Sequence, residues 1–592
     1  MSHTIEEKRE EKKSAKRRSM ACREQILSED YGAALVDFAL TGNELDGMDY
    51  CMEMIDDQFA VLYFRRTSQA PISVSQYTYN SIPKLYGLMQ DAVAPTGEYD
   101  PINLIKSGIS QIQGPPLSLT GKGVVIGFID TGIHYNLDVF RRPDGTSRII
   151  SIWDQTIQDG TPPEGFSFGT EYTNEQINEA LRSDNPLSIV PSTDTDGHGT
   201  AVASVAAGSD VGYGMNFLGA APDADIVMVK CKEAKQYLRD YYFVQDGVPA
   251  YCDANIGMAV KYLDSFTQVG ERPVVICLGM GTNLGDHAGN SILARYLDRI
   301  ARKRNRVVVV CGGNEGNAGH HYHGLFPLED GQTTQTVEIR VGEETPGIVM
   351  ELWNAIPNTM SISIRSPGGE VIPYMDFRSR ETRNFSFIYE RTRISVDHVL
   401  VEQGGGDELV VFRIERPTAG VWTFSVDVKG DVGYGYINMW LPITQFLGTD
   451  TYFLRPSPYE TLTEPSLADN VITVSSYNAG NNSFYLESGR GFARDGRLKP
   501  DVAAPGVNVS TALGSRTGSC MAAAITAGGA AQLMQWAVIE KNDLLAQSME
   551  VKSYFARGAV RSPDLVYPNR SWGFGRLNVS RAFDILAGTE GQ

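Results

Sequence analysis

Four nearly continuous apolar runs between residues 121 and 313 constrain the fold more than any other feature of the chain. They are rich in valine and isoleucine and read GKGVVIGFID, DIVMVKC, PVVICLG and RVVVVCGG. Helical stretches such as IGMAVKYLDSFTQV and NSILARYLDRIARK separate them. Strands that are apolar on both faces and alternate with helices are typical of a parallel sheet with helices on both faces. The sequence therefore predicts an α/β domain.

A second region, residues 324–461, has a different periodicity. Apolar and polar residues alternate in QTVEIRVG, GIVMELWN, MSISIRSP, ELVVFRIERP and GVWTFSVDV, with turn residues between these segments. Such alternation is typical of an antiparallel, jelly-roll-like β-sandwich. Because helical patterns return in the last part of the chain, we expect the sandwich to be inserted into the α/β domain. We expect it to stabilise that domain rather than contribute catalytic side chains.

The remaining boundaries follow shifts in composition along the 592 residues. A charged tail, residues 1–22, precedes a small α/β unit at 23–92. The loose stretch QDAVAPTGEYDP marks the end of that unit. We expect the main α/β domain to be formed by residues 93–323 and 462–592.

Charge and cysteine usage narrow the function classes. The formal net charge of −19 argues against nucleic acid or an anionic membrane as a partner. The N-terminus has no apolar segment typical of a secretory signal, and we expect no transmembrane helix. The seven cysteines include no CxxC pair. Their odd number and wide spacing favour reduced thiols and an intracellular location.

Four chemically active residues follow predicted strands or begin predicted helices. Asp130 ends an apolar run, where a carboxylate is costly unless it is paired. His198 stands between two glycines before a helical pattern, and Asn314 lies in a glycine-rich turn where its amide could face a reacting carbonyl. Cys520 begins a helix, whose positive end favours a thiolate. Each residue alone is more often structural, but chance rarely places all four in such contexts.

The motifs DTGI, DGHGTAVASVAAG, GGNEG, KPDVAAPG and GSCMAAA resemble, in order, the catalytic blocks of the subtilisin-like serine proteases. The resemblance implies that Asp130 orients His198 and that His198 is the general base and acid. It implies that Asn314 stabilises the tetrahedral oxyanion and that Cys520 occupies the nucleophile position. The substrate-binding residues it implies are Leu278, Gly279, Gly312 and Gly313.

More narrowly, SIPKLYGLM, GKGVVIGFIDTGIHY, the GTNLGDHAG loop and the β-rich insert resemble the spore-germination Csp proteases. This implies a zymogen whose prodomain helps the catalytic domain to fold, is cut off by the enzyme itself and can stay bound in the cleft. We expect the cut between Leu88 and Asp91. The resemblance further implies a protein substrate, such as another zymogen, and a cytoplasmic or spore-associated location. We expect a monomer that needs no cofactor.

The thiol at residue 520 departs from the serine of the family. Ser519 is not an equivalent nucleophile, because one residue along a helix turns a side chain by about 100°. The longer carbon–sulfur bond displaces the attacking atom, and a misplacement of about 1 Å can cost about a hundredfold in rate. We therefore expect impaired or absent peptidase activity. Whether Cys520 is natural or a replacement stays open, although the intact Asp130, His198 and Asn314 favour a replacement.

Two other functions remain open. A pseudoprotease could act as a signalling or scaffold protein without turnover. Alternatively, the insert could bind carbohydrate or protein through exposed Trp353, Trp422 and Trp440, although we expect these residues in its core. No EF-hand or HExxH pattern identifies a metal.

Overall fold

The computed structural model describes residues 22–38, 50–66, 78–89, 92–94, 99–209, 217–267, 271–327, 331–376, 378–429 and 434–588. The expected charged tail therefore lies outside the described residues, except for Cys22. Gln90 and Asp91, at the expected cut, also lie outside them.

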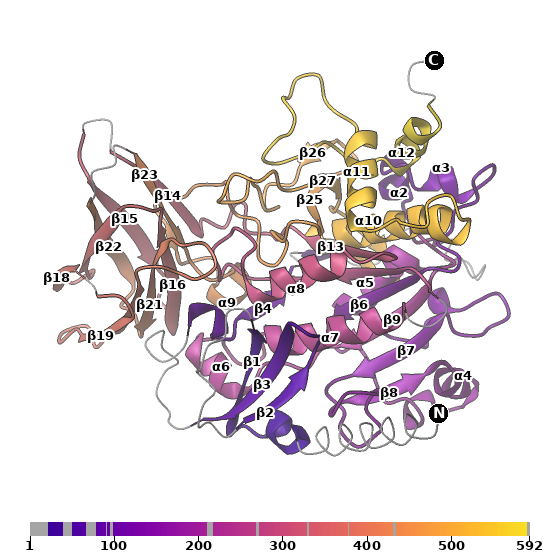
Figure 1. Ribbon diagram of the computed structural model, residues 1–592, viewed down its shortest axis with the longest axis horizontal. Helices are drawn as coiled ribbons and strands as arrows, with labels where there is room; N and C mark the ends of the chain where they lie inside the picture. The colour runs from indigo at the N-terminus through magenta and orange to yellow at the C-terminus, as the bar shows by residue number, and fades with distance from the viewer. Residues whose placement is uncertain are drawn as a thin grey trace, which may run out of the picture.

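A large, mostly parallel sheet forms the centre of the molecule, and this confirms the predicted α/β class (Figure 1). Its order is β26-β25-β13-β11-β6-β9-β7-β8, and β27 also pairs with β25. The inner strands pair in parallel, whereas β8 and β26 pair antiparallel with their neighbours. The bounds are β6 (Val125–Asp130), β7 (Ile149–Asp154), β8 (Thr170–Thr173), β9 (Asp225–Lys230), β11 (Val274–Leu278), β13 (Arg306–Cys311), β25 (Ile472–Asn478), β26 (Ser483–Phe484) and β27 (Val502–Pro505).

Two pairs of helices pack against this sheet. Helices α5 (His198–Ala207) and α10 (Ser519–Met534) contact each other and the central strands. Helices α7 (Asp253–Ser265) and α8 (Ile292–Ala301) lie between the central sheet and a smaller N-terminal sheet. The other described α-helical segments of five or more residues are residues 22–27, α2 (Ile102–Lys106), α4 (Asn174–Arg182), α6 (Gln236–Tyr241), α11 (Ser548–Gly558) and α12 (Val579–Leu586).

Helix α10 is buried along its whole length. With the turn that follows, Ser519–Ile539 is long and apolar enough to cross a membrane by length and composition, but 83% of the tested window is buried inside the protein. A helix that is apolar on every side is typical of a core. We therefore interpret α10 as the core helix that packs on the central strands.

The N-terminal unit contains the antiparallel strands β1 (Tyr31–Asp37), β2 (Tyr50–Met54) and β3 (Phe59–Arg65), in the order β1-β3-β2. Strand β1 packs on α7 and α8 (Figure 1). Buried Leu35 and Val61 belong to the same hydrophobic core as the central sheet. The N-terminal unit and the α/β domain are therefore joined by one apolar interface.

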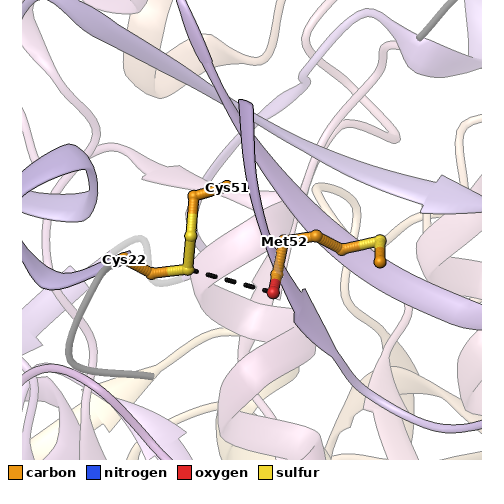
Figure 2. Close-up of a disulfide and its surroundings, with 3 residues drawn as sticks. All are labelled: Cys22, Cys51 and Met52. Carbon is orange, nitrogen blue, oxygen red and sulfur yellow. Dashed lines mark hydrogen bonds between the residues drawn. A yellow bond between two sulfur atoms is a disulfide. The ribbon is translucent and has the colours of Figure 1, made fainter. Parts of the chain in front are cut away.

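A disulfide joins Cys22 to Cys51 in the N-terminal unit (Figure 2). The two Cα atoms are 5.5 Å apart and the residues are separated by 29 positions in sequence. The dashed line in Figure 2 marks the 3.9 Å approach of the Cys22 sulfur to the carbonyl oxygen of Met52. A disulfide sulfur has no hydrogen to donate, so this approach is a contact. The expectation that all cysteines are reduced is therefore wrong for this pair.

The insert folds as two packed antiparallel sheets, as the sequence predicts (Figure 1). Their orders are β14-β23-β16-β21-β20-β19 and β18-β17-β22-β15-β24. The bounds are β14 (His321–Phe326), β15 (Thr334–Val341), β16 (Gly347–Asn354), β17 (Thr359–Arg365), β18 (Val371–Asp376), β19 (Glu381–Ser386), β20 (Arg393–Val399), β21 (Glu408–Glu415), β22 (Gly420–Lys429), β23 (Gly435–Trp440) and β24 (Tyr452–Phe453).

The tryptophans of the insert form no exposed platform. Trp353, Trp422 and Trp440 are at most 1% exposed. Trp422 belongs to the core between the two sheets, whereas Trp353 and Trp440 pack in the core shared with the α/β domain. The insert also contains one helical turn, α9 (Thr444–Leu447), which the sequence pattern did not predict.

We predict that alkylation will distinguish the disulfide from the thiols. After denaturation without reductant, five cysteines should react, because Cys231, Cys252, Cys277, Cys311 and Cys520 are free. All seven cysteines of the chain should react after reduction. Intact-mass measurement of purified protein checks both numbers. Seven modified cysteines without reductant would contradict the pairing, and Cys51→Ser should leave Cys22 reactive.

Candidate active site

Asp130 lies at the end of β6, where the order of the central sheet changes direction. Strands β9 and β7 lie on one side of β6, and β11 and β13 lie on the other. Sites in open α/β sheets form at such points, beyond the carboxyl ends of the strands. The Asp130 carboxylate is buried, and its Oδ1 accepts hydrogen bonds from the Thr131 backbone N–H at 2.8 Å and from Nδ1 of His198 at 2.7 Å. The Thr131 hydroxyl also lies 3.3 Å from this oxygen. The buried carboxylate is therefore held by donors from both Thr131 and His198.

His198 begins α5 and is fully buried. Gly197 precedes it with a φ of 84°, a left-handed conformation that favours glycine. Gly199 follows it, and a Cβ atom there would lie 2.3 Å from the carbonyl oxygen of Gly132. The two flanking glycines thus allow the helix to begin against the end of β6. Nε2 of His198 makes no hydrogen bond with the described residues.

The electrostatic surroundings of His198 favour its charged form. Burial disfavours the imidazolium, but the Asp130 carboxylate and the Cys520 sulfur oppose this effect. Together they raise the pKa of His198 well above its ordinary value. The ring is therefore a base whose protonated form the site stabilises.

Cys520 is the second residue of α10, and its side chain is fully buried. The backbone of Gly279 shows how closely the site is assembled. A Cβ atom on Gly279 would lie 3.1 Å from Cε1 of His198, 3.3 Å from Oδ2 of Asp130 and 3.4 Å from Cβ of Cys520. Three residues that are far apart in sequence thus surround one glycine. The hydroxyl of Ser519 lies against the Cys311 thiol instead.

Asn314 follows β13 and faces the start of α10. Its Oδ1 accepts a hydrogen bond of 3.0 Å from the backbone N–H of Ser519. This bond fixes the orientation of the amide, so Nδ2 points away from the Ser519 N–H. Nδ2 is buried and has no hydrogen-bond partner among the described residues. An unpaired buried donor is costly, and it suits a site that binds a developing negative charge.

A segment of the N-terminal region lies across these residues as a strand. Strand β4 (Leu85–Leu88) pairs antiparallel with β10 (Tyr251–Cys252) on one edge and with β12 (Met280–Gly281) on the other. The next residue, Met89, donates its N–H to the carbonyl oxygen of Gly279 at 3.1 Å. The Met89 carbonyl oxygen lies 3.5 Å from the backbone nitrogen of Cys520. The Met89 carbonyl therefore faces the start of α10.

The chain resumes beyond the undescribed Gln90 and Asp91 as β5 (Ala92–Ala94). Strand β5 pairs antiparallel with β29 (Gly514–Thr517), which pairs in turn with β28 (Val509–Thr511). Strand β29 ends three residues before Cys520. Strands on both sides of Met89 and Gln90 are thus paired with the walls of the site.

The expected substrate-binding residues have different surroundings. Gly279 accepts the hydrogen bond from Met89. Leu278 is buried as the last residue of β11, and its backbone pairs with neighbouring strands of the central sheet. Cβ atoms on Gly312 and Gly313 would meet Leu462 and Thr463, respectively, within 3 Å. Gln445 was not predicted from the sequence, although its side chain accepts a hydrogen bond of 2.7 Å from the Leu88 N–H.

The comparison with protein families decides the classification. The sequence profile of the Subtilase family matches residues 121–372 and 455–575, which is more than half of the chain. The chain belongs to the subtilase family. The gap in the match, residues 373–454, covers most of the sandwich, and residues 1–120 and 576–592 also lie outside the match.

Two similar proteins support this classification. The structure of the Clostridium perfringens CspB protease is 29% identical, covers 82% of this subtilase and 98% of the CspB chain, and gives a TM-score of 0.73. The Arabidopsis thaliana subtilisin-like protease SBT3.6 is 31% identical over 184 residues. That alignment spans 28% of this chain and 22% of the plant protein.

We predict that Asp130→Asn destabilises the protein in a pH-dependent manner. The pair stabilises the fold fully below about pH 6.5, the ordinary pKa of histidine, and this contribution is lost as pH rises through the raised pKa of His198. The loss of Tm caused by Asp130→Asn should therefore be largest near pH 6 and shrink at higher pH. Calorimetry between pH 6 and pH 9.5 measures it, with the surface variant Asp138→Asn as control. A loss that grows with pH would contradict the assignment.

Proposed function

We propose that this subtilase is an endopeptidase zymogen that cuts its own chain between Met89 and Gln90. The observation that carries the proposal is the position of the Met89 carbonyl oxygen, 3.5 Å from the backbone nitrogen of Cys520. The unpaired Nδ2 of Asn314 belongs to an amide that is bonded to the same helix start. Two such donors are what a tetrahedral oxyanion needs.

The first half of the reaction forms an acyl-enzyme. The side chain of residue 520 attacks the carbonyl carbon of Met89, and Nε2 of His198 takes its proton. Asp130 keeps Nδ1 protonated and stabilises the imidazolium. The negative charge on the carbonyl oxygen is held by the backbone N–H of Cys520 and the amide of Asn314.

The second half releases both products. When the tetrahedral intermediate collapses, the bond from Met89 to Gln90 breaks, and His198 gives its proton to the new amino group of Gln90. Water then attacks the acyl carbon and gives a proton to His198. The carboxylic acid of Met89 leaves residue 520, whose side chain regains the proton from His198, and the acid then loses its own proton to solvent.

The contacts of the N-terminal region support its assignment as a prodomain. Its sheet shares a core with the catalytic domain, and its last residues form the central strand of the three-stranded sheet β10-β4-β12. Main-chain pairing of this kind recognises an extended peptide with little regard to side chains. The same cleft would accept another protein's pro-form after the segment leaves, which is the role suggested by the resemblance to the Csp proteases.

The thiol at residue 520 favours a second candidate, a pseudoprotease that acts by binding. A thiolate and an imidazolium can form a reactive pair, but here the donors are arranged for an oxygen nucleophile. We infer that the Cys520 form cuts slowly or not at all, and that a serine at this position gives the active peptidase.

We predict that Cys520→Ser produces a cut between Met89 and Gln90, because only the attacking atom changes. Intact-mass analysis should give two fragments, and gel filtration should show that they stay together. Cys520→Ala and the double variant Cys520→Ser/His198→Ala should stay full length. A serine form that remains uncut, or is cut only within residues 1–22, would favour the pseudoprotease.

We predict that Asn314→Ala in the Cys520→Ser background slows this cut by about a hundredfold to a thousandfold, because one oxyanion donor is lost. The rate is read from gel samples taken during cell-free synthesis. Ser519→Ala in the same background should still be cut, since its hydroxyl lies against Cys311. Loss of cutting in Ser519→Ala together with normal cutting in Asn314→Ala would reverse the two roles.

A further inference from the structure

We infer that the inserted sandwich sets substrate specificity: Ile443 and Gln445 cover the cleft and restrict the third residue before the cut to glycine. This inference rests on the proposed cut after Met89, which makes Gly87 that third residue. The insert supplies none of Asp130, His198 and Cys520, but its helical turn α9 contacts β4 (Figure 1).

Space around Gly87 is the first observation. A Cβ atom on Gly87 would lie 2.1 Å from Oε1 of Gln445 and 2.5 Å from Cδ1 of Ile443. Both atoms are the ends of side chains, so a larger residue would have to push these ends away. Ile443 is 1% exposed and packs in the main core, which restricts its movement. Movement of Gln445 would break its 2.7 Å hydrogen bond with the Leu88 N–H.

The backbone at Gly87 gives no other reason for a glycine. Gly87 lies inside strand β4, and its φ is not among the positive values that favour glycine. A strand position of this kind accepts most L-residues, and glycine there weakens the strand. The covering side chains are therefore the feature that requires glycine.

Gln445 also completes the edge of β4. Successive N–H groups of a strand point to opposite edges. The Met89 N–H points to Gly279, so the Leu88 N–H points toward the edge that β10 occupies. Along β4, strand β10 pairs with Leu85 and Tyr86 and does not reach Leu88. Oε1 of Gln445 accepts this hydrogen bond in place of a backbone carbonyl.

A buried acid holds α9 in position. Glu315, the neighbour of Asn314, accepts hydrogen bonds from the backbone N–H and the hydroxyl of Thr444 at 3.0 and 3.1 Å. His320 lies 2.9 Å from the same carboxylate and also contacts the carbonyl oxygen of Thr451. The turn that presents Gln445 is thus tied to the residue beside the oxyanion donor. Glu315 acts here as a positioning residue.

The inference defines a class of substrate. It is an extended peptide with glycine at the third position before the cut and apolar residues at the positions of Leu88 and Met89, which are at most 3% exposed. Main-chain pairing with β10 and β12 supplies the affinity, while Ile443 and Gln445 reject a side chain at the glycine position. A larger residue at the glycine position would break the hydrogen bond between Gln445 and the Leu88 N–H and displace Ile443. We expect these two effects to decrease the cutting rate about tenfold or more.

The test compares four chains in the Cys520→Ser background: native Gly87, Gly87→Ala, Ile443→Ala/Gln445→Ala, and these three substitutions combined. Each chain is made by cell-free synthesis, and its cutting is followed by gel and mass spectrometry. Gly87→Ala should slow the cut after Met89 at least about tenfold. The combined variant should be cut within about threefold of Ile443→Ala/Gln445→Ala, because the space for the methyl group is restored.

A matched control uses Gly87→Ala with Ile388→Ala and Gln332→Ala, two exposed positions on the insert. This variant should stay as slow as Gly87→Ala alone. Recovery in the combined variant separates a clash from a folding defect, because both chains carry the same alanine at residue 87. Equal rates for Gly87 and Gly87→Ala, or no recovery in the combined variant, would overturn the inference. Absence of cutting in the Gly87 chain itself would instead overturn the proposed function.

Discussion

The arrangement of the molecule depends on one strand, β4, which lies between β10 and β12 and leads to the start of α10. Leu85, Tyr86, Leu88 and Met89 are at most 3% exposed, and their backbone fills the space between β10 and β12. Without this strand, both of those short strands would present unpaired edges. The N-terminal unit, the catalytic domain and the insert all meet at this segment. Its register decides which carbonyl group faces the start of α10.

Buried carboxylates of the insert reinforce the position of the segment. Glu351 accepts a hydrogen bond of 2.7 Å from the Tyr79 hydroxyl, and Glu402 accepts one of 2.6 Å from the Asn80 amide. Burial raises the pKa of both carboxyl groups, although hydrogen bonds, including that from Tyr79 to Glu351, oppose the shift. Release of residues 79–89 would remove the Tyr79 donor from Glu351 and the Asn80 donor from Glu402. In the proposed mechanism this cost favours a prodomain that stays bound after the cut.

The α/β class could be predicted, and so could the positions of Asp130, His198 and Asn314 near the start of α10, because buried parallel strands leave a strong pattern. Asp130 and Asn314 directly follow such strands, and glycines flank His198. The disulfide had no comparable signal, since the pairing of Cys22 with Cys51 depends on how the helical residues 22–27 lie relative to β2. Gln445 was missed because α9 has four residues, too few to show a helical period within a β-rich region. The contact of Gln445 with Leu88 joins residues 357 positions apart.

The register of β4 between β10 and β12 also explains why exchanging oxygen for sulfur at residue 520 should affect activity. Met89 is fixed by its 3.1 Å hydrogen bond to Gly279, while β4 and β5 pair with the walls on both sides of it. Its carbonyl oxygen is 3.5 Å from the Cys520 nitrogen, a long hydrogen bond that could tighten as charge develops on the oxygen. Because the peptide is held on both sides of Met89, its carbonyl carbon has little freedom to shift and accommodate a longer carbon–sulfur bond. The adjustment must then come from the side chain of Cys520, which is fully buried. The expected loss of activity is therefore geometric, because the donors keep their positions while the attacking atom does not.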